Sequence, residues 1–345
     1  MRILLYSPAF HPSIGGLEAI VDLLARGFTE AGHSVRVACT TRNPAPDAHP
    51  YGVVRNPGPL QLLRLMRWSQ IFLQTNISLR GLWPLLLVPR PWVVAHHTWY
   101  RRADGSIGWQ DRLKRFALRF ATGIAASRAL AEDLSSPSTV IGNCYDDAVF
   151  RPLPGCERSR ELIFVGRLVS DKGVADLVAA LGLLRQRGLR PRLTLVGQGP
   201  EEAAIRQGIA AADLQEQVRP VGAKTGQELA ALLNAHRIMV VPSRYNEPFG
   251  IVALEGIACG CVVVGSAGGG LGEAIGPCGV TFPNGDVEAL ANHLEDLLAR
   301  PDALESYRQA ASRHLARHLR RHVIAEYLRV LAPLAEKGGA AGALR

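Results

Sequence analysis

The sequence has few of the features that mark several large classes of protein. Its 345 residues include six cysteines, and none of them has the Cys-x-x-Cys spacing of a zinc site. Six thiols in so long a chain do not form a disulfide framework, so we expect reduced, mostly buried cysteines and a cytoplasmic protein. There is no Asp-x-Asp, and no His, Cys and carboxylate set has metal-ligand spacing. We therefore predict no metal requirement and no bound cofactor.

Long uninterrupted apolar segments are also missing. Residues 82–94 form the most apolar later stretch, but three prolines and Arg90 interrupt it, so it cannot be a spanning helix. Residues 1–8 are too short for a signal-peptide core. With 48% hydrophobic and 20% charged residues, the composition is that of a folded protein, and the length predicts two domains.

Positive charge is unevenly distributed. The net charge is +9, and residues 1–155 hold 17 Lys and Arg against 10 Asp and Glu. Within 111–120, Leu113, Phe116, Ala117 and Phe120 share one side of an expected amphipathic helix. Two interpretations stay open: a solvated helix face, or contact with anionic lipid headgroups at the inner membrane face. The basic side chains of this cluster are Arg101, Arg102, Arg112, Lys114, Arg115 and Arg119.

Nucleic acid is not an expected partner of this basic half. The basic residues are not interleaved with aromatic ones in the manner of nucleic-acid-binding proteins, and no known motif of that class is present. Net charge alone is therefore the only argument for such binding.

Short apolar runs alternate with helical patterns along the chain, which is typical of parallel sheets built from βαβ units. A segment rich in proline and polar residues, 150–159, separates two such series. The expected fold is α/β, with two Rossmann-like doubly wound domains facing each other across a cleft and ligands at the carboxyl ends of strands. The predicted strands are 2–6, 34–39, 71–74, 92–95, 122–126, 161–165, 192–196, 218–221, 238–241, 262–265 and 280–282, and one predicted helix is 17–31, capped by Gly32.

The stretch Glu247-Pro-Phe-Gly-Ile-Val-Ala-Leu-Glu255 is the first candidate site. Pro248 suits a first helical turn, so we expect a helix to begin there and to present its free N–H groups to an anion. Phe249 and Gly250 would let the backbone approach a ligand. Glu255 would then lie about 12 Å further along the helix, close to the separation of hexose and ribose in a nucleotide sugar.

A second candidate is Phe164-Val-Gly-Arg-Leu-Val-Ser-Asp-Lys-Gly173. Gly166 ends a predicted strand, and Arg167 and Lys172 follow at its carboxyl end. Arg167 can bind phosphate as a fork and Lys172 as a point charge. Two surface cations in a loop are the alternative, but we favour a functional role.

Three further motifs carry weaker signals. Gly197 lies in Leu195-Val-Gly-Gln-Gly-Pro-Glu201, which lacks the third glycine of a dinucleotide fingerprint and which a simple strand-to-helix turn explains. Gly15 and Gly16 open a helix after the first strand, either as a phosphate contact or as a turn. His97 ends a strand, where it either bonds the sugar or its acceptor, or caps the strand together with His96.

Taken together, these residues resemble the retaining glycosyltransferases of family 4, which have the GT-B fold. The resemblance spans nearly the whole chain. Its elements are Gly15-Gly16, His97-Thr98, Ala126-Ser127, the link from Asn143 through Asp146 and Phe150 to Pro152, Gly166-Arg167, Asp171-Lys172-Gly173, Gly197-x-Gly199-Pro200, Pro242-Ser243, the Glu247 and Glu255 pair, and Gly269-Gly270-Leu271-x-Glu273.

The resemblance implies a role for each matching residue. Arg167 and Lys172 would hold the donor diphosphate, helped by backbone N–H groups near Gly16 and Ile251. Glu247 would contact the transferred sugar, Glu255 the ribose, and His97 would lie near the sugar and acceptor. Residues around Gly197 and from Val221 to Lys224 would border the base. It also implies an N-terminal acceptor domain, 1–153, a donor domain, 154–320, and a C-terminal helix, 321–337, that crosses back to the N-terminal domain. The residues 338–345 themselves predict a frayed tail.

The expected function is transfer of a hexose, with retention, from a UDP- or GDP-linked donor to a hydroxyl of a sugar, lipid or small-molecule acceptor. The alternative is a nucleotide-sugar epimerase or hydrolase of the same architecture, although the pair of glutamates argues against it.

Overall fold

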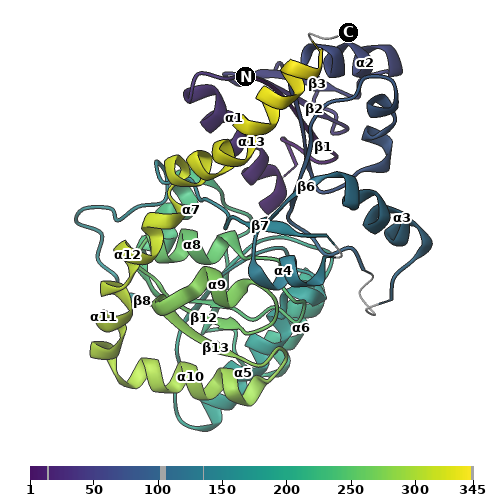
Figure 1. Cartoon of the computed structure of the whole chain (residues 1–345). Coiled ribbons are helices and arrows are strands. Elements are labelled where there is room, and N and C mark those ends of the chain that lie inside the picture. Colours follow the sequence, from purple (N-terminus) through teal and green to yellow (C-terminus); the bar gives the residue numbers. More distant parts are fainter. Residues whose placement is uncertain (14, 102–105, 135, 343–345) are drawn as a thin grey trace. The chain divides into compact units, whose positions relative to one another are not determined.

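The structure is a computed structural model that describes residues 1–13, 15–101, 106–134 and 136–342 (Figure 1). The chain divides into two compact units, one formed by residues 1–144 and 319–345 and the other by residues 145–318. Arg102 and residues 343–345 of the predicted tail lie outside the described residues. Each unit is described by itself.

The first unit is built on a parallel sheet of seven strands in the order β3-β2-β1-β4-β5-β6-β7. The five strands predicted in this half are confirmed, whereas β3 and β7 were not predicted. Both lie at edges of the sheet, and neither has a fully buried residue, so they lack the apolar signal of the central strands. The strands are β1 (Arg2–Ser7), β2 (Ser34–Cys39), β3 (Gly52–Arg55), β4 (Ile71–Thr75), β5 (Trp92–His96), β6 (Thr122–Ala125) and β7 (Ser138–Val140).

Helices cover both faces of this sheet, so every residue of the central strand β4 is buried. Figure 1 shows α1 and α13 on one face and α2 and α3 on the other. The helices are α1 (Gly16–Glu30), α2 (Pro59–Trp68), α3 (Trp109–Ala117), α4 (Arg128–Asp133) and α13 (Arg320–Gly342), with single 3-10 turns at η1 (Leu79–Gly81), η2 (Trp83–Leu86) and η3 (Leu118–Phe120).

Helix α13 comes from the end of the chain and packs on α1 near its beginning. The Tyr327 ring is buried and meets the Phe28 ring edge-on, at 6.1 Å between centroids. Gly27 leaves room for Ile324, whose side chain occupies the place that a Cβ would need. The helix continues to Gly342, so it includes part of the predicted tail.

The second unit has a parallel sheet of six strands in the order β10-β9-β8-β11-β12-β13, all of them predicted. Its core joins apolar side chains of these strands to α5 and α10, for example Phe164, Leu181 and Leu294. The strands are β8 (Arg160–Val165), β9 (Leu193–Val196), β10 (Val218–Pro220), β11 (His236–Val241), β12 (Val262–Ser266) and β13 (Gly279–Phe282). The helices are α5 (Val174–Gln186), α6 (Glu202–Ala211), α7 (Gly226–Ala235), α8 (Ile251–Ala258), α9 (Leu271–Ile275), α10 (Val287–Ala299), α11 (Pro301–Gln309) and α12 (Ala311–Leu315), with 3-10 turns η4 (Ser170–Lys172), η5 (Gly276–Cys278) and η6 (Ala316–His318).

Strand order reverses once in each sheet, between β1 and β4 in the first unit and between β8 and β11 in the second. Ligands of open α/β sheets bind beyond the carboxyl ends of the strands at such a reversal. The loops after β1, β8 and β11 are therefore the places to look for a site, and they hold most of the motifs singled out above.

Candidate functional site

In the second unit, the loops that follow β8 and β11 are joined by backbone hydrogen bonds. The amides of Arg244 and Tyr245 both donate to the Asp171 carbonyl, at 2.9 and 3.2 Å. This fixes the turn η4 against the loop after β11. Two motifs that are far apart in the sequence therefore form one surface at the strand reversal.

Lys172 and Glu247 meet on this surface. The Lys172 ammonium lies 2.5 Å from Glu247 Oε1, and the Ser243 hydroxyl donates to the same oxygen at 2.7 Å. The Glu247 side chain is 11% exposed and that of Lys172 is 24% exposed. The carboxylate is thus held by two donors in a partly desolvated place, where charge-assisted hydrogen bonds are strong.

Gly173 explains how the two loops come so close. Its φ is +67°, in the left-handed region that favours glycine, and a Cβ there would lie 1.8 Å from the Pro242 carbonyl oxygen. Any other residue would push the η4 turn away from the loop after β11. The position of the Lys172 ammonium depends on this glycine.

The predicted start of the next helix is wrong. Helix α8 begins at Ile251 rather than at Pro248, and Gly250 before it has a φ of +99°. Residues 247–250 stay extended or turned because the Glu247 backbone forms a parallel β-bridge with Gly269, and its carbonyl accepts the Gly270 amide at 2.7 Å. The helical spacing of about 12 Å predicted between Glu247 and Glu255 therefore does not apply.

The N–H groups at the start of α8 still lie directly after this turn, close in the chain to Glu247. Pro248 is half-buried, and the Phe249 ring is buried against the His318 ring, 5.5 Å away between centroids. The Phe249 side chain is therefore part of the packing of the unit, and its backbone is what can approach a ligand.

Glu255 lies in the second turn of α8, with a side chain of intermediate exposure. Burial of its carboxyl group, with a smaller contribution from the nearby negative Asp146, raises the pKa of Glu255 to about 8. A carboxyl group with this pKa is mostly protonated at neutral pH, so it can donate as well as accept hydrogen bonds.

The remaining predicted residues of the second unit follow β8, β9 and β10. Arg167 is exposed and forms no ion pair or hydrogen bond in the part of the chain described here. The Gly166 amide donates to Val196, the Gly197 amide to Gly222, and the Val221 amide to Leu195, so the carboxyl ends of these strands are joined. Lys224 is paired with Glu228 at 3.1 Å.

In the first unit, Gly15 and Gly16 lie where they were predicted, at the N-terminus of α1. Gly15 has an extended backbone and precedes the first helical residue, Gly16. The N-cap residue is a glycine and has no side chain to cap the helix, while the Glu18 carboxylate of the first turn lies against Gly15, 2.5 Å from where a Cβ would stand.

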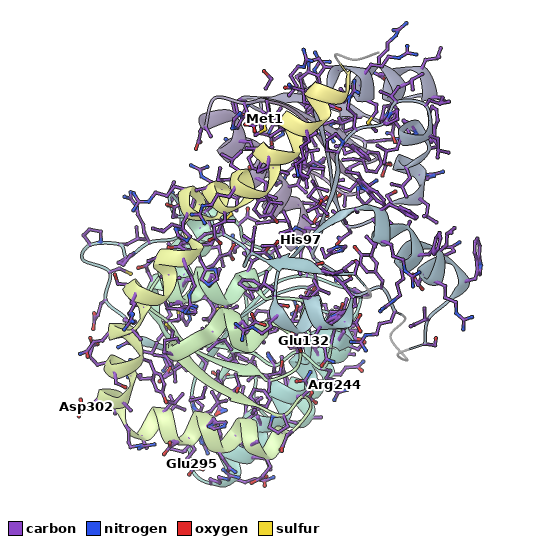
Figure 2. All side chains as sticks on the ribbon, viewed as in Figure 1. Met1, His97, Glu132, Arg244, Glu295 and Asp302 are labelled. Atoms are coloured by element: carbon purple, nitrogen blue, oxygen red, sulfur yellow. The ribbon has the colours of Figure 1, made fainter. Side chains whose placement is uncertain are left out.

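His97 follows β5 and is labelled in Figure 2. Burial lowers its pKa to about 4, opposed by the Asn143 side chain, so the imidazole is neutral near pH 7. Among the described residues, the two ring nitrogens have no hydrogen-bond partner of normal geometry. His96, in contrast, is a buried residue of the interior, and its Nδ1 forms a hydrogen bond with the buried Tyr100 hydroxyl at 2.8 Å.

Two residues of the second unit were missed by sequence reasoning. Asp176 is buried in the first turn of α5, and its carboxylate accepts hydrogen bonds from the guanidinium of Arg244, with Nε at 2.7 Å (Arg244 is labelled in Figure 2). This pair ties α5 to the loop after β11. The only sequence signal was an acidic residue in a first helical turn, which is common in proteins with no such pair.

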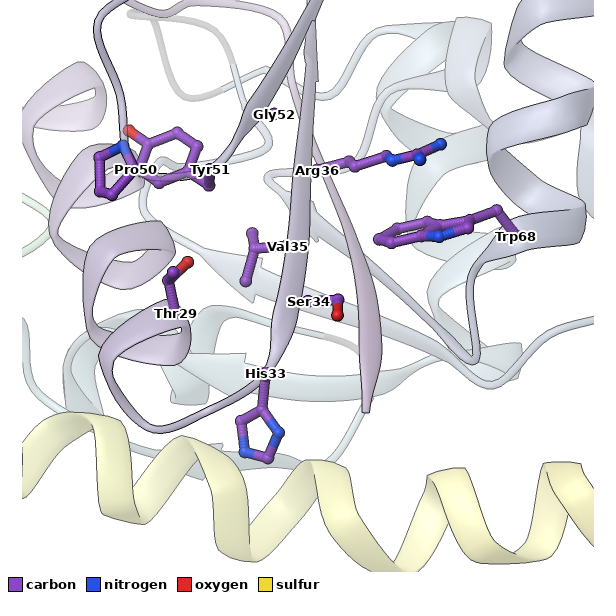
Figure 3. A pocket seen from close by; sticks show the side chains of 9 residues that line it. All are labelled: Thr29, His33, Ser34, Val35, Arg36, Pro50, Tyr51, Gly52 and Trp68. Atoms are coloured by element: carbon purple, nitrogen blue, oxygen red, sulfur yellow. The ribbon is translucent and has the colours of Figure 1, made fainter.

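A hollow of about 430 Å³ in the first unit does not belong to this site (Figure 3). It is lined by the starts of β2 and β3, by Thr29 and by Trp68, which stacks under Arg36 at 4.3 Å. These residues lie at the amino ends of the strands, the edge opposite to the ligand-binding one. No group of three metal-ligating side chains occurs among the residues that the structure describes.

Comparison with known proteins finds a matching family model for each half of the chain. A model of the family described as "Glycosyltransferase Family 4" matches residues 14–149, and one described as "Glycosyl transferases group 1" matches residues 149–314. A glycogen synthase of Mycobacterium tuberculosis is 39% identical over 184 residues, which are 51% of this chain and 44% of that protein. The match thus spans less than half of this relative.

Two other proteins match over nearly their whole length. The GDP-mannose:cellobiosyl-diphosphopolyprenol alpha-mannosyltransferase of Xanthomonas oryzae is 26% identical, and the match covers 95% of this chain and 96% of that protein. The crystal structure of Anabaena HepE in complex with UDP-glucose has a TM-score of 0.80 at 19% identity, and the match covers 96% of this chain and 100% of the HepE chain. With both halves matched by adjoining family models and the fold shared with solved members, the chain belongs to the family 4, group 1 glycosyltransferases with the GT-B fold.

Proposed function

We propose that this protein transfers a hexose from a UDP- or GDP-linked donor to a hydroxyl acceptor, with retention of the anomeric configuration and without a metal ion. The observation that carries the proposal is the hydrogen-bonded set of Lys172, Glu247 and Ser243 at the strand reversal of the second unit. It combines a cation for a diphosphate with a carboxylate for sugar hydroxyls in one place.

The leaving nucleoside diphosphate gains negative charge as the glycosidic bond breaks. Lys172, the exposed Arg167 and the N–H groups at the start of α8 all present positive charge beyond the same strand ends. Preorganised charge of this kind stabilises the transition state more than the ground state. The three groups together take the role that a divalent cation has in other enzymes.

Glu255 and the joined ends of β8, β9 and β10 would receive the nucleoside. The protonated form of Glu255 would share hydrogen bonds with the ribose hydroxyls, and residues 221–224 would border the base. One protein described above was crystallised with UDP-glucose and another is named for GDP-mannose, so both bases stay in the proposal.

The test uses UDP-glucose and GDP-mannose as donors with a panel of hydroxyl acceptors, in the presence of EDTA. We expect release of nucleoside diphosphate that depends on acceptor, and a product whose anomeric configuration, read by NMR, equals that of the donor. An inverted product, or turnover that needs an added divalent cation, would overturn the corresponding part of the proposal.

The alternative, an epimerase or hydrolase, is separated by incubation with donor alone. Neither of the matched families and none of the relatives described above carries such a name. Fast epimerisation or hydrolysis of the donor without acceptor would favour it over the transferase.

A further inference from the structure

Residues 60–120 of the first unit differ from the rest of the chain in charge and in surface. They contain ten Lys and Arg against two Asp, a net charge of +8 in a chain whose total is +9. They also supply nine of the ten large apolar side chains that are exposed in the described structure. Basic charge and exposed apolar surface are thus concentrated in the same segment.

Helix α3 and the turn η3 form the centre of this surface. No residue of α3 is buried, and the side chains of Trp109, Phe116 and Phe120 are 71%, 54% and 73% exposed. The Phe116 and Phe120 rings meet edge to face with centroids 5.8 Å apart, and the Arg119 guanidinium lies over Phe116 at 5.7 Å. The apolar stripe predicted from the sequence is real, but it faces away from the unit.

Polar contacts hold α3 in this orientation. Arg115 donates from its NH2 group to the Asp133 carboxylate at 2.8 Å and from Nε to the Tyr100 carbonyl at 3.4 Å. The buried Leu118 of η3 adds an apolar anchor. A helix normally turns its apolar stripe toward the core. Here a salt bridge occupies the inner side, so the aromatic residues are left for a partner.

A second group of exposed apolar residues lies on the same face of the sheet. It comes from α2 and η2. Leu82 and Trp92 connect it to the surface around η3, because both pack against the apolar cluster that contains Met66 of α2 and against the one that contains Leu118 of η3. Its members are Leu60, Trp83, Leu86 and Leu87, accompanied by the exposed arginines Arg64, Arg67 and Arg80.

We propose that this face, centred on Trp109, Phe116 and Phe120 with Arg112 and Arg119, binds the surface of an anionic lipid bilayer. Exposed patches of this kind mark sites of interaction. Aromatic and leucine side chains enter the boundary between headgroups and acyl chains, and arginines bind the phosphates. A second copy fits less well, because the same face would then oppose its own positive charge. No helix in the described part of the chain has the length and apolarity to cross a membrane, so this contact is peripheral.

The experiment is flotation of the full chain with two kinds of vesicle, phosphatidylcholine alone and phosphatidylcholine mixed with phosphatidylglycerol. We expect binding to the anionic vesicles only, weakened by salt, with a blue shift of tryptophan emission that Trp109→Phe reduces. Arg112→Glu with Arg119→Glu should lower the partition coefficient by about tenfold or more. Phe116→Ala with Phe120→Ala should weaken binding at both low and high salt.

The matched control is Arg190→Glu with Arg313→Glu, which changes the net charge equally at two exposed positions of the second unit. It should bind like the wild type. All these positions are exposed, so unchanged thermal unfolding is expected and serves as the check of folding. The proposal is overturned if wild-type protein stays unbound, if the control loses binding as fully as the α3 variant, or if the phenylalanines instead support concentration-dependent dimerisation.

Discussion

At the scale of the residue, Lys172 is shared between the protein and the proposed donor. Its ammonium is one of two donors to a nearly buried Glu247 carboxylate. Lys172→Ala should therefore lower turnover by about 10² or more and also destabilise the fold by about 1–3 kcal/mol, because a desolvated carboxylate loses its partner.

Arg167→Ala is the matched comparison, since Arg167 is exposed and unpaired within the described structure. We expect a similar loss of turnover without a loss of stability. Steady-state kinetics and urea unfolding of both variants separate the two effects. Wild-type turnover in both would remove them from the site.

The pKa of Glu255, raised to about 8, makes stability depend on pH. The folded state holds this proton more tightly than the unfolded state, whose carboxyl group titrates near 4.5. The stabilisation is therefore complete below about 4.5 and is lost as pH rises toward 8. Urea unfolding from pH 5 to 8.5 should show a decline in the wild type that is absent in Glu255→Gln, with at most a few kcal/mol between the two limits.

The same variant tests the proposed ribose contact. If the carboxyl group is protonated when the donor binds, Glu255→Gln keeps most of the donor affinity at pH 7, whereas Glu255→Ala loses it. Equal loss in both variants would mean that the ionised form is needed. Asp146→Asn should lower the pKa of Glu255, because it removes the neighbouring negative charge.

At the scale of the element, the η4 turn is positioned by Gly173. Gly173→Ala combines a left-handed backbone with a Cβ 1.8 Å from a carbonyl oxygen, so we expect a loss of about 2–4 kcal/mol and a large fall in turnover. Gly182→Ala in α5 is the control, since a Cβ there meets nothing within 4 Å. It should be neutral or stabilising by up to about 1 kcal/mol. Equal effects in both variants would contradict the role given to Gly173.

The helices and strands also show most clearly where prediction from the sequence succeeded and where it failed. The central strands of both sheets are buried on two faces, so their apolar runs were visible in the sequence. The edge strands β3 and β7 carry no such pattern. Pro248 suggested a helix start by local preference, but the β-bridge between Glu247 and Gly269, set by tertiary structure, overrode it.

The side chains of the site also divide into those that the sequence predicted and those that it did not. Lys172 and Glu247 were recognisable from their motifs, and the structure brings them together. Asp176 with Arg244, and Asp146 beside Glu255, were not predicted because each pair is created by packing between distant segments. The amphipathic pattern of α3 showed that an apolar stripe exists but not on which side the protein would cover it, since Arg115 and Asp133 decide that.

At the scale of the whole molecule, the first unit is completed by a helix from the far end of the chain. Tyr327→Ala removes a fully buried ring against Phe28, and we expect a loss of about 3–5 kcal/mol. Hydrogen exchange should show faster exchange in residues 1–144 and little change in residues 145–318. Tyr327→Phe keeps the packing and should retain most of the stability. Uniform loss of protection in both units would show that they unfold together.

Phe28 and Tyr327 are far apart in the sequence, so their contact can form only late in synthesis. The second unit is continuous, so all of its residues are available once His318 has left the ribosome. The first unit begins earlier but lacks α13 until residues 320–342 are added. During synthesis, the surface of α1 around Phe28 therefore stays uncovered while some three hundred residues are translated, and we expect chaperones that recognise exposed apolar helices to bind the nascent chain there.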